Sequence, residues 1–168
     1  MSKWVLGVLG GSGLYEIDGL ENAREEQISS PWGEPSGSVM RGNMGDVELV
    51  FMPRHGKGHR LSPTHVNYQA NIDVLKRAGV TDILSISAVG SLQQQYAPGH
   101  FVFIDQFIDR TFAREKSFFG DGCVAHVSMA HPICERLSQL AYEAGQAVGV
   151  TCHKGGTYMV MEGPQFST

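Results

Sequence analysis

The chain has 168 residues, 42% of them hydrophobic, and its 13 Lys and Arg against 17 Asp and Glu give a net charge of -4. This length predicts one domain over residues 1–168, and the composition favours neither a disordered chain nor a surface that coats nucleic acid. The three cysteines have no CxxC spacing, no apolar stretch is long enough to cross a bilayer, and no basic and apolar leader segment is present. We therefore expect a cytoplasmic protein without disulfides and without a membrane partner.

Apolar runs and turn signals predict, in chain order, a mixed α/β protein. Strands are expected within residues 3–15, 46–56, 80–92, 99–109 and 155–163, helices within residues 62–79 and 131–149, and loops with short strands over 23–46. Ser62 followed by Pro63 is a helix start signal, and Lys76 and Arg77 before Gly79 are a stop signal. Strands separated by helices favour a mixed central β-sheet flanked by helices.

Three of the expected strands end in small or cationic residues. These are Gly10, Gly11, Ser12 and Gly13 after the first strand, Arg54 and His55 after the second, and Ser87, Ala88 and Gly90 after the third. Each group alone also fits a tight turn or a solvated loop. Ligands of an α/β sheet bind at strand ends, and together an arginine fork, a histidine donor and a serine hydroxyl beside glycine N–H groups suit phosphate.

Three other kinds of site fit the sequence poorly. The glycine turn lacks the spacing of the dinucleotide fingerprint G-x-G-x-x-G, and neither Lys-Ser nor Lys-Thr follows it as in a triphosphate-binding loop. His55 and His59 are spaced like two zinc ligands on a helix, but the Gly-Lys-Gly between them forms helix poorly and holds no glutamate. The sequence thus disfavours a dinucleotide, a triphosphate and a zinc protease site.

Six motifs resemble those of the trimeric purine nucleoside phosphorylase family, and most specifically its methylthioadenosine phosphorylase branch. They are "GGSGLY", "PRHGKGHRLSPTHVNYQANI", "SAVGSL", "IDQFIDRT", "HVSMAHP" and "EGPQFST". The resemblance runs from Leu6 to Thr168 and implies a glycosyltransferase (pentosyltransferase) of purine and methionine salvage. The implied reaction is phosphate-dependent cleavage of 5'-methylthioadenosine to adenine and 5-methylthioribose 1-phosphate, with phosphate as co-substrate and no metal or organic cofactor.

The resemblance also assigns residues. It places Ser12, Arg54, His55, Ser87 and Ala88 at phosphate, and Phe166, Ser167 and His126 at the nucleoside. Ser167 stands at the purine edge, where its hydroxyl can donate or accept, which favours a 6-aminopurine. His126 matches a residue that reaches the 5' end of the nucleoside from a neighbouring subunit, so a homotrimer is implied.

The family's chains continue beyond Thr168, and the resemblance places the acid that protonates the base in that part. The 168 residues then correspond to the N-terminal portion of a phosphorylase domain, either truncated or nicked and still bound to its own C-terminal fragment. Two alternatives stay open. One is a phosphorylase for 6-oxopurine nucleosides, inosine or methylthioinosine, and the other is a non-catalytic fragment that binds phosphate or nucleoside.

Overall fold

The computed structural model describes residues 4–11 and 17–163, which form two compact units. The first unit runs to Ala88 and includes Glu115–Phe118; the second holds Val89–Arg114 and the residues from Phe119 onward. The first unit contains β1 Val5–Gly10, β2 Glu21–Glu26, β3 Val39–Met44, β4 Val47–Pro53, a 3₁₀ helix Pro63–His65, α1 Tyr68–Arg77 and β5 Asp82–Ser85. The second contains β6 Phe101–Phe103, β7 Gln106–Arg110, α2 Glu135–Ala147, β8 Cys152–Lys154 and β9 Thr157–Met161.

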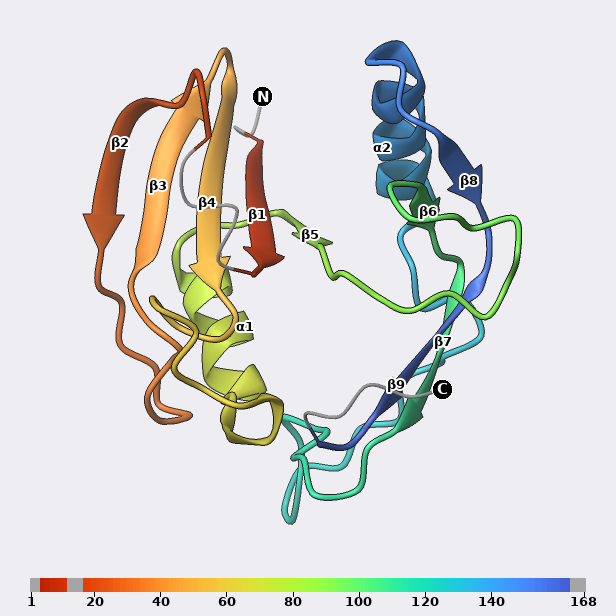
Figure 1. Cartoon of the computed structure of the whole chain (residues 1–168). Helices are drawn as coiled ribbons and strands as arrows, with labels where there is room; N and C mark the ends of the chain where they lie inside the picture. Colours follow the sequence, from red (N-terminus) through yellow and green to blue (C-terminus); the bar gives the residue numbers. More distant parts are fainter. Residues whose placement is uncertain (1–3, 12–16, 164–168) are drawn as a thin grey trace. The chain divides into compact units, whose positions relative to one another are not determined.

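The first unit is built on a mixed sheet with the strand order β2-β3-β4-β1-β5 (Figure 1). The central strand β1 runs parallel to β4 and β5, whereas β3 is antiparallel to both β2 and β4. Gly10 is in register with Pro53, and Leu9 with Ser85. The carboxyl ends of β4, β1 and β5 therefore lie side by side. The mixed sheet, together with its helix, confirms the predicted mixed α/β class.

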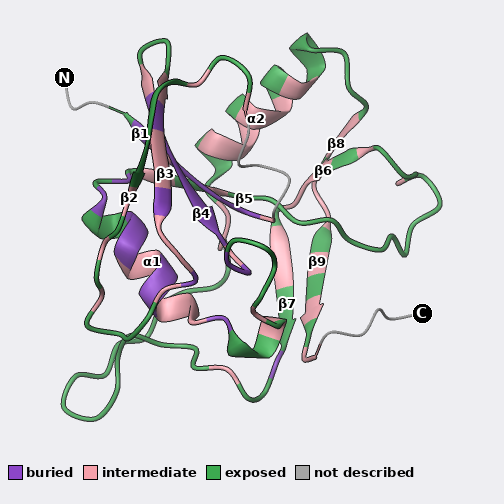
Figure 2. Ribbon diagram, turned by 60° about the vertical axis from the view of Figure 1, so that its left-hand side comes forward, coloured by how far each residue is buried: buried purple, intermediate pink, exposed green. Residues whose placement is uncertain are grey.

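Both faces of β1 and β4 are buried, because their apolar residues alternate between two clusters. One face carries Val5, Leu9, Val39, Val50 and Met52 and packs against Val74, Leu75 and Ala78 at and just after α1. The other carries Val8, Leu49 and Phe51, with Ile17 and Leu20 packed against it. Figure 2 shows many of these buried residues on β4 and α1. Strands β1 and β4 are thus the most buried strands of the sheet.

Arg41 on β3 ties the outer strands to the core. Its side chain is 16% exposed and lies 3.2 Å from carboxylate oxygens of both Glu26 and Glu48. Its Nη2 also donates to the carbonyl of Ala78, just after α1. Removing one partner of a buried pair typically costs about 3–5 kcal/mol, which applies to Arg41 and Glu48, whereas the pair with Glu26, which is 41% exposed, contributes less.

Helix α1 begins later than its sequence signals predicted. Residues 63–65 form only a 3₁₀ turn, and Ser62 makes no cap to the backbone; its Oγ instead lies 2.7 Å from Nδ1 of His65. The cap is Asn67, whose side-chain oxygen accepts from the backbone N–H of Ala70 at 3.0 Å. An asparagine cap satisfies an otherwise unpaired first-turn donor, and here it overrides the early serine and proline.

The second unit consists of two two-stranded parallel sheets, β6 with β8 and β7 with β9, and of helix α2. Helix α2 approaches β8 closely, since a Cβ added to Gly145 would lie 2.5 Å from Sγ of Cys152. Of the residues described in this unit, no hydrophobic one is buried. Neither described helix, α1 or α2, is long and apolar enough to cross a membrane.

Three local predictions in the second unit need correction. The run 99–109 is not one strand but β6 and β7, separated at Asp105, whose carboxylate accepts from the backbone N–H of Gly156 at 3.3 Å. Helix α2 begins at Glu135 rather than near Pro132. Strand β8 was not predicted from the sequence. Both β8 and the break at Asp105 depend on partners about fifty residues away in sequence, which local patterns do not report.

Candidate anion-binding site

The strand ends of the first unit bring three predicted phosphate residues together. The backbone N–H of Arg54 donates to the carbonyl of Gly10 at 3.1 Å, which places the end of β4 directly beside the end of β1. On the other side of β1, the N–H of Ile86 donates to the carbonyl of Leu9 at 2.9 Å. Ser87 therefore follows β5 at the same edge of the sheet as Arg54. Ser12 lies outside the described residues.

The guanidinium of Arg54 links these strand ends through its side chain. Its Nη1 donates to the hydroxyl of Ser87 at 2.5 Å, and its Nε donates to Nε2 of His55 at 3.3 Å. Arg54 is half-buried, whereas Ser87 and Ala88 are exposed. A permanently charged, planar donor group beside an exposed hydroxyl is suited to bind an oxyanion.

His55 is 9% exposed, and its ring contacts are those of a neutral imidazole. Because Nε2 accepts from Arg54, the ring proton sits on Nδ1, which donates to the carbonyl of Leu61 at 2.9 Å. Burial lowers the pKa of His55, and the charges of Arg54 and His59 lower it further, against the opposing hydrogen bond to Leu61. The ring of His59 stacks on that of His55 at 4.3 Å. Across residues 4–11 and 17–163, no group of three or more His, Cys, Asp or Glu could hold a metal ion.

Sequence reasoning missed two buried polar residues behind Arg54. Ser36 donates through Oγ to the carbonyl of Arg54 at 2.7 Å, and Asn71 on α1 is hydrogen-bonded to Ser36. The signal available was Asn71 itself, a polar residue on the apolar face of a predicted helix and part of the "VNYQANI" motif. Ser36 carried no signal, since it stands in a polar loop.

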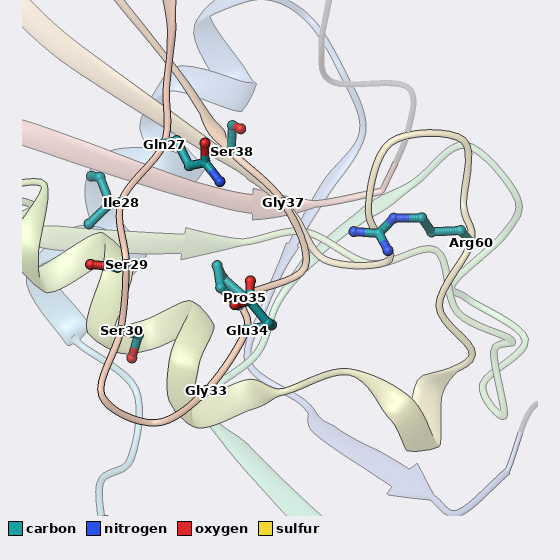
Figure 3. A pocket seen from close by; sticks show the side chains of 10 residues that line it. All are labelled: Gln27, Ile28, Ser29, Ser30, Gly33, Glu34, Pro35, Gly37, Ser38 and Arg60. Atoms are coloured by element: carbon teal, nitrogen blue, oxygen red, sulfur yellow. The ribbon is translucent and has the colours of Figure 1, made fainter.

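A polar cavity of about 540 Å³ opens beside the loop that joins β2 to β3 (Figure 3). It is lined by Gln27, Ile28, Ser29, Ser30, Gly33, Glu34, Pro35, Gly37, Ser38 and Arg60. The guanidinium of Arg60 points to the loop and donates to the carbonyl of Ser36 at 3.0 Å. Through Arg60 and Ser36 the cavity is linked to the main chain of Arg54. Of the predicted phosphate residues that the structure describes, none lines it.

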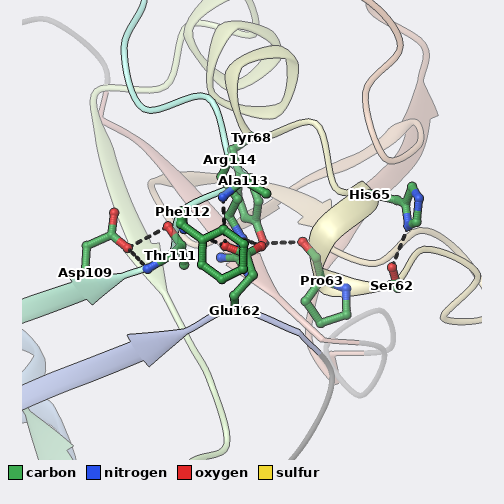
Figure 4. A network of polar contacts seen from close by, with 10 residues as sticks. All are labelled: Ser62, Pro63, His65, Tyr68, Asp109, Thr111, Phe112, Ala113, Arg114 and Glu162. Atoms are coloured by element: carbon green, nitrogen blue, oxygen red, sulfur yellow. Dashed lines mark hydrogen bonds and ion pairs between the residues drawn. The ribbon is translucent and has the colours of Figure 1, made fainter.

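In the second unit, Glu162 anchors the end of β9 to the segment that follows β7 (Figure 4). Its Oε2 accepts from the backbone N–H groups of Phe112 and Ala113 at 2.8 and 3.3 Å, and its Oε1 lies 3.5 Å from Nε of Arg114. His126 belongs to the same unit and is exposed in an irregular segment. The predicted nucleoside residues Phe166 and Ser167 lie outside the described part of the chain.

Comparison with known proteins gives one family. The profile described as the phosphorylase superfamily matches residues 5–168. The chain is 62% identical over 166 residues to the S-methyl-5'-thioadenosine phosphorylase of Cereibacter sphaeroides, and 60% identical over 168 residues to that of Bradyrhizobium diazoefficiens. These alignments cover 99% and 100% of the chain but only 57% and 58% of the two relatives. The chain thus spans less than two thirds of their length.

Solved structures give the same result. A methylthioadenosine phosphorylase from an antarctic soil metagenomic library matches with a TM-score of 0.94 and 46% identity, covering 99% of this chain and 59% of that one. The methylthioadenosine phosphorylase of Schistosoma mansoni in complex with adenine matches with a TM-score of 0.91 and 37% identity, covering 99% of this chain and 68% of that one. Together these similarities confirm the resemblance that the motifs indicated.

Proposed function

We propose a function from one premise: the chain belongs to the phosphorylase superfamily. The proposed reaction is phosphate-dependent cleavage of 5'-methylthioadenosine to adenine and 5-methylthioribose 1-phosphate, a step of purine and methionine salvage. The observation that carries it is the cluster of Arg54, His55 and Ser87 where β4 and β5 end beside β1. The names of the relatives and the adenine bound to the Schistosoma mansoni structure support the choice of nucleoside.

In this reaction the bond between C1' and the purine nitrogen breaks, while a phosphate oxygen forms a new bond to C1' from the opposite face. The sugar passes through an oxocarbenium-like state, so the enzyme must hold the anionic nucleophile against C1'. Arg54 balances the phosphate charge, Ser87 supplies a hydroxyl, and Ser12 with the backbone of Ala88 completes the donor set. His55 contacts Arg54 and keeps the guanidinium directed to the strand end. We assign no residue to protonation of the purine, because the acid is expected beyond Thr168.

The proposal includes the finer predictions about substrate, assembly and location. Phe166 and Ser167 would contact the purine, with Ser167 favouring a 6-amino group, and His126 would reach the site of a neighbouring subunit in a homotrimer. Residues 1–168 would be the N-terminal portion of a single phosphorylase domain in the cytoplasm, with phosphate as co-substrate and no other cofactor.

The test is base release from methylthioadenosine, methylthioinosine and inosine, each with and without inorganic phosphate. The intact mass of the denatured sample is recorded first, to establish whether a second polypeptide accompanies the 168 residues. We expect adenine to be released only with phosphate, and hypoxanthine more slowly. Release without phosphate would contradict phosphorolysis, and faster release of hypoxanthine would contradict the role of Ser167.

A second candidate is favoured by the 57% and 58% coverage of the relatives. If these residues lack the group that protonates the purine, the chain would bind phosphate or nucleoside without turnover. Calorimetric binding of phosphate to a sample that releases no base would support this candidate over the enzyme.

A further inference from the structure

Ser36 lies at the centre of a buried hydrogen-bond network in the first unit. Ser36 is 0% exposed and Asn71 is 1% exposed. The backbone N–H of Ser36 donates to Oδ1 of Asn71 at 2.8 Å, and Nδ2 of Asn71 donates to Oγ of Ser36 at 2.8 Å. Oγ of Ser36 in turn donates to the carbonyl of Arg54 at 2.7 Å, and the Ser36 carbonyl accepts from Arg60 at 3.0 Å. All the polar groups of Ser36 are thereby paired.

This network holds the main chain of Arg54 at its carbonyl, whereas β1 holds it at its N–H. The N–H of Arg54 is bonded to the carbonyl of Gly10, and its carbonyl is bonded to Ser36, so both flanking peptide groups are fixed. The direction in which a side chain leaves the backbone follows from the orientation of those peptide groups. The guanidinium that reaches Ser87 is therefore aimed by residues that lie behind the strand end.

Asn71 has no evident reason to be buried other than this network. It occupies the face of α1 on which Ala70, Val74 and Leu75 are buried. Asparagine forms helix less well than leucine or alanine, and a buried amide costs free energy unless it is hydrogen-bonded. A fully paired buried network fixes one arrangement of the chain, which is what an oriented charge requires.

We propose that Ser36 and Asn71 are positioning residues of the anion site, which set the main chain of Arg54 so that its guanidinium meets phosphate. This inference rests on the proposed function, because it assumes that phosphate binds at Arg54. It adds two buried residues behind the site, and it gives a role to Asn71, the second asparagine of the "VNYQANI" motif.

The test compares Ser36→Ala with Val74→Ala in the 168-residue chain. Val74 is 1% exposed on the same helix and takes no part in the network, so both variants lower the urea midpoint. Calorimetric titration with inorganic phosphate separates them. We expect Ser36→Ala to weaken phosphate binding about tenfold, as for the loss of one oriented charged contact, and Val74→Ala to change it by less than about twofold.

Asn71→Asp provides the second variant. It keeps an oxygen to accept from the Ser36 N–H but loses the donor to the Ser36 hydroxyl, so it should weaken phosphate binding as well. It decides the comparison if Ser36→Ala does not fold. Unchanged phosphate affinity in a folded Ser36→Ala or Asn71→Asp would overturn the inference while leaving the proposed function intact. If the wild-type chain itself binds no phosphate, the proposed site and the inference both fail, which is a different result.

Discussion

Arg54 and His55 are consecutive residues whose side chains are hydrogen-bonded to each other, with Nε of Arg54 donating to Nε2 of His55 at 3.3 Å. Consecutive side chains of an extended strand point to opposite faces, so this contact is possible only because the strand ends at Pro53 and the chain turns. The contact requires a neutral histidine. Another N–H of the same guanidinium, on Nη1, donates to the hydroxyl of Ser87.

Arg54 is expected to carry most of the phosphate affinity. Arg54→Met should weaken phosphate binding by about tenfold to a hundredfold, since hydrogen bonds to charged groups contribute about 1.5–3 kcal/mol each. Arg54→Lys should be intermediate, because lysine keeps the charge and loses the planar fork. Arg24→Met is the control, because this substitution removes the same charge and Arg24 is exposed on the edge strand β2. Equal losses in Arg54→Met and Arg24→Met, measured by calorimetry, would show that only net charge matters.

His55 is expected to make stability depend on pH. Its pKa is lower in the folded chain than the ordinary 6.5, so the unfolded chain takes up the proton first as the pH falls. The contribution of His55 is present in full above the ordinary pKa, is lost as the pH falls through that value, and levels off below the folded pKa.

The measurement is the free energy of unfolding in urea between about pH 5 and 8, for the wild type and for His55→Asn. Asparagine can still donate to the Leu61 carbonyl but does not titrate. The wild type should lose more stability than the variant toward low pH. Parallel curves would mean that His55 does not contribute, because the remaining histidines are common to both proteins.

Gly56 and Gly58 form a matched pair for the loop after Arg54. Both have positive φ, +74° and +77°, but a Cβ on Gly56 would lie 2.8 Å from the carbonyl oxygen of Ser36, whereas one on Gly58 meets nothing within 4 Å. Gly58→Ala should cost about 1–2 kcal/mol from backbone conformation alone. Gly56→Ala should cost about 2–4 kcal/mol, because the close contact adds to it. Urea unfolding measures both, and similar losses would contradict the close packing of this loop on Ser36.

Glu162 is expected to protect the segment after β7. Its side chain is 12% exposed, and Glu162→Ala would leave the N–H groups of Phe112 and Ala113 without this acceptor, at a cost of about 0.5–1.5 kcal/mol because both amides are exposed to water. Hydrogen exchange at these two amides should become faster. Glu162→Gln retains an acceptor oxygen and should exchange more slowly than the alanine variant. Glu143→Ala, on the exposed face of α2, is the control and should leave both amides unchanged.

The local pattern of the sequence was enough to locate β1, β4 and the end of α1, and with them Arg54 and His55. A continuous apolar run bounded by glycine or proline defines a buried strand without reference to its partners, and the residue after it stands at the strand end. Gly79, after Lys76 and Arg77, ends the helix for an equally local reason, since it adopts the left-handed conformation at φ +84°. The motifs added the family, because they are specific combinations of residues.

Only the tertiary structure decided which polar groups meet. Ser36 and Asn71 are 35 residues apart, and Glu162 and Phe112 are 50 apart, so no local pattern joins them. The same holds for Asn67, whose side chain both caps α1 and donates to the carbonyl of Trp32. Apolar periodicity records which side of an element is buried, whereas the pairing of a buried hydrogen-bonding group depends on which distant segment the fold brings within about 3 Å of it.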